Sequence, residues 1–187
     1  MKINTPNQLT ILRVALIPLL VFTLAYKNFT MDLISVAVFS IAAITDYYDG
    51  YLARKYNLVT DFGKIMDPVA DKLLVAAALI CLVERGDLAA YAVILILARE
   101  FAVTALRAVA SSHGYVMPAD NFGKWKTGLQ ITAIIMLILS WKIWFLDIYA
   151  IGLLILWISI IISLYSGWRY FADYWSYRKQ QGMGEFS

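Results

Sequence analysis

The sequence predicts an all-α fold, that of a polytopic integral membrane protein with six transmembrane helices. Two bulk properties lead to this prediction: 61% of the 187 residues are hydrophobic, and the mean hydropathy is +0.70. An ordinary soluble chain holds about 45–50% apolar residues, so this chain would expose too much apolar surface to water. A third observation is that the apolar residues form six segments, each about 18–25 residues long and therefore able to cross a bilayer.

The six predicted helices follow one another through short polar connections, and the chain suits a single membrane-embedded domain over residues 1–187. They are expected at 9–26, 32–56, 62–83, 88–110, 123–141 and 146–166, the last able to extend to Tyr174. Thr5 or Asn7 can cap the first helix.

Basic residues predict the orientation, because Lys and Arg collect in cytoplasmic loops. With the N-terminus in the cytoplasm, only Lys27, Arg85 and Lys142 fall at external turns, and the other 13 of the 16 lie on the cytoplasmic side. Both termini are then cytoplasmic. The net charge of +3 is small, so no nucleic-acid partner is expected.

Four aspartates stand out because they lie within otherwise apolar helices. On one helical face, at spacing i, i+3, i+4, i+7, the chain carries Asp46, Asp49, Gly50 and Ala53. On a second, at spacing i, i+4, i+8, it carries Gly63, Asp67 and Asp71. A single aspartate near a helix end is usually a cap or a solvated charge, but four at helical spacing fit that interpretation poorly. Charged groups inside a membrane indicate function, and clustered carboxylates suit hard cations such as Mg²⁺.

The stretch from Asp46 to Asp71 reads D-x2-D-G-x2-A-R-x8-G-x3-D-x3-D. It resembles the signature of the CDP-alcohol phosphotransferase family at every fixed position, and the helix pattern along the chain is similar to that family. The resemblance implies transfer of a phosphatidyl-type group from a CDP-linked donor to an alcohol, with release of CMP. It also implies a homodimer and a site for two metal ions, Mg²⁺ or Mn²⁺.

The resemblance also implies a role for each motif residue. The expected metal ligands are Asp46, Asp49, Asp67 and Asp71, with Asp71 also the general base that takes the proton of the acceptor hydroxyl. The expected contacts to the donor nucleotide are Asp46, Gly50, Ala53, Arg54 and Gly63. From the residues alone, small side chains equally indicate close helix packing, and an arginine at a helix end can extend to the membrane surface.

Three shorter segments resemble those of bacterial phosphatidylglycerophosphate synthases: Asn7-Gln8-Leu9-Thr10 followed by Arg13, Ala98-Arg99-Glu100, and Gly123-Lys124-Trp125-Lys126-Thr127. This resemblance implies CDP-diacylglycerol as donor and sn-glycerol 3-phosphate as acceptor. The predicted topology places the active site on the cytoplasmic side of a bacterial plasma membrane. A phosphorylated acceptor needs cationic partners, for which the candidates are Arg107, Lys126, Lys124 and Arg99. Each of them could instead mark the cytoplasmic interface.

Two other functions are compatible with the same residues. Within the family the acceptor could be serine, inositol phosphate or phosphatidylglycerol. Carboxylates inside a membrane also occur in ion-coupled transporters, although the paired repeats that many transporters carry are not found in this sequence.

Overall fold

The computed structural model describes residues 5–55, 61–117, 121–143 and 146–181, with side chains described at 10–45, 66–117, 125–141 and 147–181. Six helices make up most of this part of the chain: α1 (Thr5–Leu24), α2 (Phe29–Lys55), α3 (Asp61–Glu84), α4 (Ala90–Ser112), α5 (Asn121–Leu139) and α6 (Ile148–Gln180). Two strands of two residues each, β1 (Lys142–Ile143) and β2 (Leu146–Asp147), pair as an antiparallel hairpin before α6. The predicted all-α class with six helices is confirmed, and the small hairpin was not predicted.

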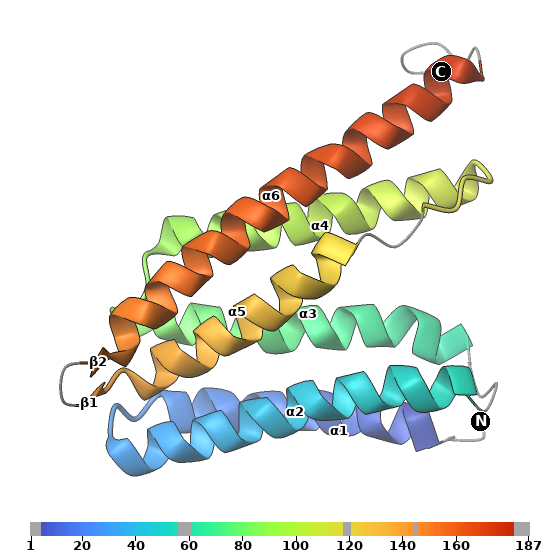
Figure 1. The fold of residues 1–187 in the computed structure, drawn as a ribbon. Helices are drawn as coiled ribbons and strands as arrows, with labels where there is room; N and C mark the ends of the chain where they lie inside the picture. The colour runs from blue at the N-terminus through green and yellow to red at the C-terminus, as the bar shows by residue number, and fades with distance from the viewer. Residues whose placement is uncertain (1–4, 56–60, 118–120, 144–145, 182–187) are drawn as a thin grey trace.

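Consecutive helices run in opposite directions, so their connections alternate between the two ends of the bundle (Figure 1). One end carries the α1–α2 turn, the α3–α4 turn and the β-hairpin, and we call it the hairpin end. α1 begins and α6 ends at the opposite end, where α2 also ends and α3 begins. α1 packs against both α2 and α3, while α6 packs along α5 and α4. The end of α2 and the start of α3, which carry the aspartate motif, therefore lie at the same end of the molecule.

Apolar side chains lie both between the helices and on their outer faces. Those that are fully or almost fully buried include Leu20, Leu24, Phe39, Leu74, Leu79, Leu82, Ile134, Leu137, Ile138 and Leu156. On the outer faces of α4 and α6, the residues that are 63–74% exposed include Ile94, Leu154, Ile161 and Trp168. Soluble monomers seldom expose large apolar patches, so these outer faces suit contact with lipid.

Membrane-spanning character can be compared helix by helix. Within the described residues, α6 alone contains a long enough stretch of high hydropathy to qualify as a span by length and composition. Shorter apolar stretches occupy 10–24, 29–45 and 125–139. One such helix does not by itself establish a membrane protein, so the six spans stay a prediction.

α6 continues to Gln180, well past the predicted end at 166 or Tyr174. Its last turns pack against α4 and the residues that follow α4. Tyr170 accepts a hydrogen bond from Arg107 at 2.5 Å, and the Arg107 guanidinium carbon lies 4.6 Å from the centre of that ring. Tyr177 stacks on Tyr115 with the ring centres 4.2 Å apart. These contacts give the extended part of α6 a protein surface to pack on.

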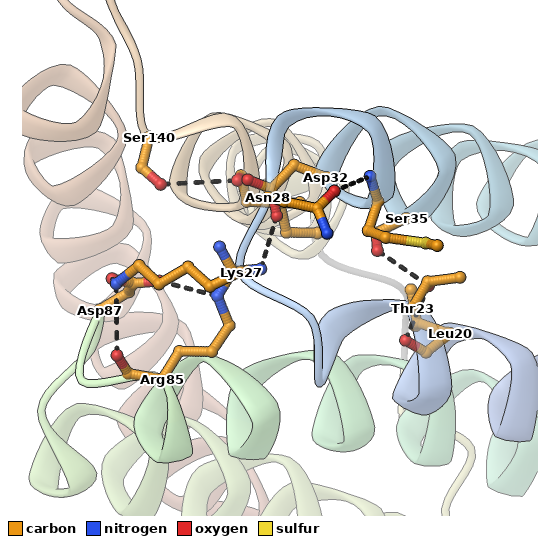
Figure 2. Close-up of polar contacts among 11 residues, drawn as sticks. Leu20, Thr23, Lys27, Asn28, Asp32, Ser35, Arg85, Asp87 and Ser140 are labelled. Carbon is orange, nitrogen blue, oxygen red and sulfur yellow. Dashed lines mark hydrogen bonds and ion pairs between the residues drawn. The ribbon is translucent and has the colours of Figure 1, made fainter.

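Four charged side chains form a network at the hairpin end (Figure 2). Arg85 bonds Asp32 through Nη1 at 2.7 Å and Asp87 through Nε at 2.9 Å. Lys27 Nζ bonds the second Asp87 oxygen at 2.5 Å, and Tyr149 donates its hydroxyl to the Asp87 carbonyl at 3.1 Å. Two cations and two anions balance, so the network joins both turns and the start of α6 without adding net charge. Lys27 and Arg85, two of the three basic residues predicted at external turns, thus lie at the same end of the molecule, and the side of the membrane that this end faces stays a prediction.

Two glycines of α6 allow close helix packing. A Cβ atom added at Gly152 would lie 2.8 Å from Met136 Cβ and 3.3 Å from the Leu137 amide nitrogen of α5. One added at Gly167 would lie 3.4 Å from Cγ and Nε of Arg99 on α4. The backbone of α6 therefore approaches α5 and the Arg99 side chain more closely than a larger residue would permit.

Candidate active site

α3 carries the second half of the aspartate motif. Asp67 and Asp71 lie one turn apart on it, about 6 Å along the helix axis, and both are half-buried. Asp67 Oδ1 accepts a hydrogen bond of 2.5 Å from the hydroxyl of Thr10 on α1. The Asp67 carboxylate is therefore bonded to the neighbouring helix α1.

The first half of the motif lies on the last turns of α2. The residues concerned are Asp46, Asp49, Gly50, Ala53 and Arg54, and Gly63 lies on the first turn of α3. Their side chains lie outside the described part of the structure. The predicted meeting of four carboxylates therefore stays a prediction.

Asp71 lines a pocket between α3, α4 and α5. The polar residues around it are Asp71, Lys72, Glu100, Thr127 and Gln130, and the apolar ones are Val75, Leu97, Phe101 and Ile131. Lys72 donates to the Pro68 carbonyl of its own helix at 3.1 Å. A carboxylate that could accept a proton thus lies in the wall of a largely apolar pocket that also holds several polar side chains.

Glu100 joins two cations beside this pocket. Its Oε1 atom forms a short ion pair with Lys126 Nζ and a 3.1 Å ion pair with Arg99 Nη1. Lys126 is only 7% exposed, and the residue that follows it, Thr127, lines the pocket. A buried ammonium needs an anionic partner, which Glu100 supplies in this arrangement.

The structure describes the side chains of three of the four predicted phosphate-binding cations, Arg99, Arg107 and Lys126. Arg99 meets Lys126 at Glu100, and it is also held by α6 through the Ser163 carbonyl at 2.9 Å and the Ser166 hydroxyl at 3.2 Å. Arg107 is directed to α6, where it bonds Tyr170. Lys124 lies in the first turn of α5, with its side chain outside the described part. Lys126 and Arg99 thus both pair with Glu100, a residue of the pocket wall, while Arg107 is directed elsewhere.

The sequence alone assigns no role to two residues of this region, Glu100 and Thr10. Glu100 is a carboxylate in an apolar helix beside Arg99, and the reasoning that singled out the aspartates applies to it equally. Thr10 lay within a segment that resembled the family, but its partner is 57 residues away. No local pattern connects two such residues, so the contact required a structure.

The donor set fits a divalent metal. Asp67 and Asp71 offer hard oxygen atoms from one face of α3, and Mg²⁺ and Mn²⁺ prefer such ligands. Over the described side chains, which leave out Asp46 and Asp49, no group of three or more potential metal ligands occurs. A complete site would therefore need the carboxylates of α2 as well.

Comparison with known proteins gives the family. The family model described as CDP-alcohol phosphatidyltransferase matches residues 3–165. A protein of Rickettsia bellii named CDP-diacylglycerol–glycerol-3-phosphate 3-phosphatidyltransferase is 43% identical, over 90% of this chain and 93% of that protein. A protein of Bacillus subtilis with the same name is also 43% identical, over 92% of this chain and 95% of that protein. A probable phosphatidylglycerophosphate synthase of Mycobacterium tuberculosis is 42% identical over 70% of this chain and 64% of that protein. With a matching family model over most of its length and relatives at this identity, the chain belongs to the CDP-alcohol phosphatidyltransferase family.

Proposed function

We propose that this protein transfers the phosphatidyl group of CDP-diacylglycerol to sn-glycerol 3-phosphate, forming phosphatidylglycerophosphate and releasing CMP. The names of the relatives support this choice of donor and acceptor. The observation that carries the proposal is the pocket lined by Asp71 and Glu100, together with the ion pair of Glu100 with Lys126. This reaction needs both a proton acceptor and a cation for the acceptor's phosphate. Asp71 at the pocket wall and Lys126, which is paired with Glu100 of that wall, would supply them.

Asp46, Asp49, Asp67 and Asp71 would hold Mg²⁺ or Mn²⁺ in the proposed site. Bound metal would neutralise the pyrophosphate oxygens and align the donor for in-line attack. Gly50, Ala53 and Gly63 lack side-chain bulk, which would let the nucleotide approach the backbone, and Arg54 would face a donor phosphate. These roles follow from the family motif.

Asp71 would remove the proton of the acceptor hydroxyl. The freed oxygen would form a bond to the phosphorus of the phosphatidyl group, while the bond from that phosphorus to the CMP oxygen breaks. The electron pair of the broken bond leaves with CMP, and the proton stays on the Asp71 carboxylate until solvent takes it. The half-buried position of Asp71 at the pocket wall supports this role.

Lys126 and Arg99 would bind the phosphate of the acceptor. A dianion left unpaired at low dielectric would cost several kcal/mol, so a site for glycerol 3-phosphate requires cations. Lys126 supplies a compact charge, while the planar Arg99 guanidinium is already bonded to α6. The structure therefore favours Lys126 over Arg107 as the principal contact.

The proposed reaction is tested with purified protein, CDP-diacylglycerol, Mg²⁺ and a panel of alcohols. CMP release should depend on glycerol 3-phosphate. Lys126→Ala should raise the KM for glycerol 3-phosphate about tenfold or more, equivalent to about 1.5–3 kcal/mol of lost charge-assisted bonding, with little change for the donor. Lys179→Ala, which removes an exposed lysine near the end of α6, is the matched control. Exclusive use of serine or inositol phosphate would contradict the proposed acceptor, and an unchanged acceptor KM in Lys126→Ala would contradict the proposed contact.

We also propose that all six helices cross the plasma membrane, with both termini and the active site cytoplasmic, and that the protein is a homodimer as the family resemblance implies. The exposed apolar faces of α4 and α6 and the charge-balanced hairpin end support the membrane arrangement. Single cysteines introduced in a Cys81→Ser background should report the orientation. Asn28→Cys should react with an impermeant thiol reagent only from outside, and His113→Cys only from the cytoplasmic side. The reverse pattern would invert the proposed orientation.

A further inference from the structure

The hydrogen bond between Thr10 and Asp67 differs from the other helical threonine bonds. Thr45, Thr104 and Thr132 each donate to a carbonyl oxygen one turn earlier in their own helix, at 2.7–2.9 Å. This local bond is the usual one for a threonine in a helix. Thr10 instead donates its hydroxyl proton to a carboxylate on a different helix, at 2.5 Å.

Burial and charge make this contact specific. Thr10 is only 2% exposed, and its partner is a half-buried carboxylate. Hydrogen bonds to an ionised acceptor are roughly twice as strong as those between neutral groups. The hydroxyl of Thr10 is therefore well placed to fix the orientation of Asp67.

A second buried side chain links α1 to α2. Arg13 follows Thr10 by one helical turn, is 1% exposed, and donates Nε to the Ala42 carbonyl of α2 at 3.4 Å. Ala42 lies one turn before Asp46. α1 thus contacts α3 through Thr10 and α2 through Arg13, two polar residues one turn apart. Neither residue belongs to the aspartate motif.

From this arrangement we infer that Thr10 is a positioning residue that presents Asp67 to the divalent cation. A carboxylate has two oxygens, so a bond to Oδ1 fixes the plane of the group while Oδ2 can still ligate a metal. Residues that orient metal ligands in this way typically contribute about tenfold to hundredfold in metal affinity. The inference rests on the proposed metal site, in which Asp67 is a ligand.

The test measures Mn²⁺ binding to the full chain in detergent by electron paramagnetic resonance, a readout independent of turnover. Thr10→Val keeps the shape of the side chain and removes the donor, so the Mn²⁺ dissociation constant should rise about tenfold to hundredfold. Thr10→Ser keeps the hydroxyl and should bind Mn²⁺ nearly as the wild type does. The matched control is Thr23→Val, since Thr23 is also buried on α1 but bonds Leu20 and Ser35 near the hairpin end (Figure 2).

The outcomes separate this inference from the metal site on which it rests. If Asp67→Asn weakens Mn²⁺ binding while Thr10→Val binds as the wild type does, the role of Thr10 is wrong and the metal site stands. If Asp67→Asn leaves Mn²⁺ binding unchanged, the proposed site itself is wrong and this inference fails with it. Should Thr10→Val not fold, Thr10→Ala and Thr10→Ser decide, because they differ only in the hydroxyl. Equal Mn²⁺ affinities for these two variants would overturn the inference.

Discussion

Asp71→Asn should lower kcat for phosphatidyl transfer by about 10²- to 10⁴-fold, the range for loss of a general base. Asparagine keeps the size of the side chain but cannot take the proton of the acceptor hydroxyl. The other carboxylate of the pocket wall, Glu100, forms ion pairs with Arg99 and Lys126, which makes it a poor replacement for the lost base. The measurement is the steady-state rate of CMP release with both substrates saturating.

The same variant should keep part of its nucleotide affinity. Asp71 is one of four proposed ligands, so its loss should weaken binding of a CDP-containing analogue less than it slows turnover. Asp67→Asn is the comparison, because that carboxylate is a proposed ligand with no role in proton removal. A near-normal rate in Asp71→Asn would exclude this residue from the mechanism.

Removal of divalent metal should abolish transfer, and Mg²⁺ or Mn²⁺ should restore it. Metal ions supply several kcal/mol of charge stabilisation in such displacements, equivalent to a loss of about a thousandfold or more. The pyrophosphate of the donor would otherwise meet the carboxylates of Asp67 and Asp71 with like charge. The experiment is dialysis of the purified protein against a chelator, followed by titration with each metal.

Variants of the proposed ligands should follow the same pattern. Asp46→Asn, Asp49→Asn and Asp67→Asn should each abolish turnover or shift the metal concentration needed for half-maximal rate. Ca²⁺ is a useful comparison, because it accepts oxygen ligands but prefers longer bonds and a larger coordination shell. Full activity in a metal-free preparation would contradict the proposed mechanism.

The fold was largely predictable because apolar segment length is a strong signal. The six helices occur in the predicted order, and all but one of their ends lie within four residues of the predicted position. The exception is α6, which runs to Gln180. Its last turns pack on α4 through Tyr170, which contacts Arg107, and on the residues after α4 through Tyr177, which stacks on Tyr115. A contact between segments about 60 residues apart leaves no local trace in the sequence.

The candidate site was predictable only where one helix carries the pattern. The four-residue spacing placed Asp67 and Asp71 on one face of α3, since helical periodicity determines that relation. Which cation reaches the pocket depends on how α4, α5 and α6 pack. Arg107 and Lys126 were equally plausible from their positions near helix ends, but one contacts Tyr170 and the other contacts Glu100.

Gly152 has a consequence for mutational tolerance across the molecule. It contacts α5 near the hairpin end, whereas the α6 groups that hold Arg99 lie 11 to 14 residues farther along, roughly 17–21 Å away. A side chain at position 152 would push α6 away from α5, and a rigid helix would carry that displacement to Ser163 and Ser166. Arg99 shares Glu100 with Lys126, so a steric change far from the pocket would alter the placement of both cations. Distance from the pocket is therefore a poor guide to which substitutions this protein can accept.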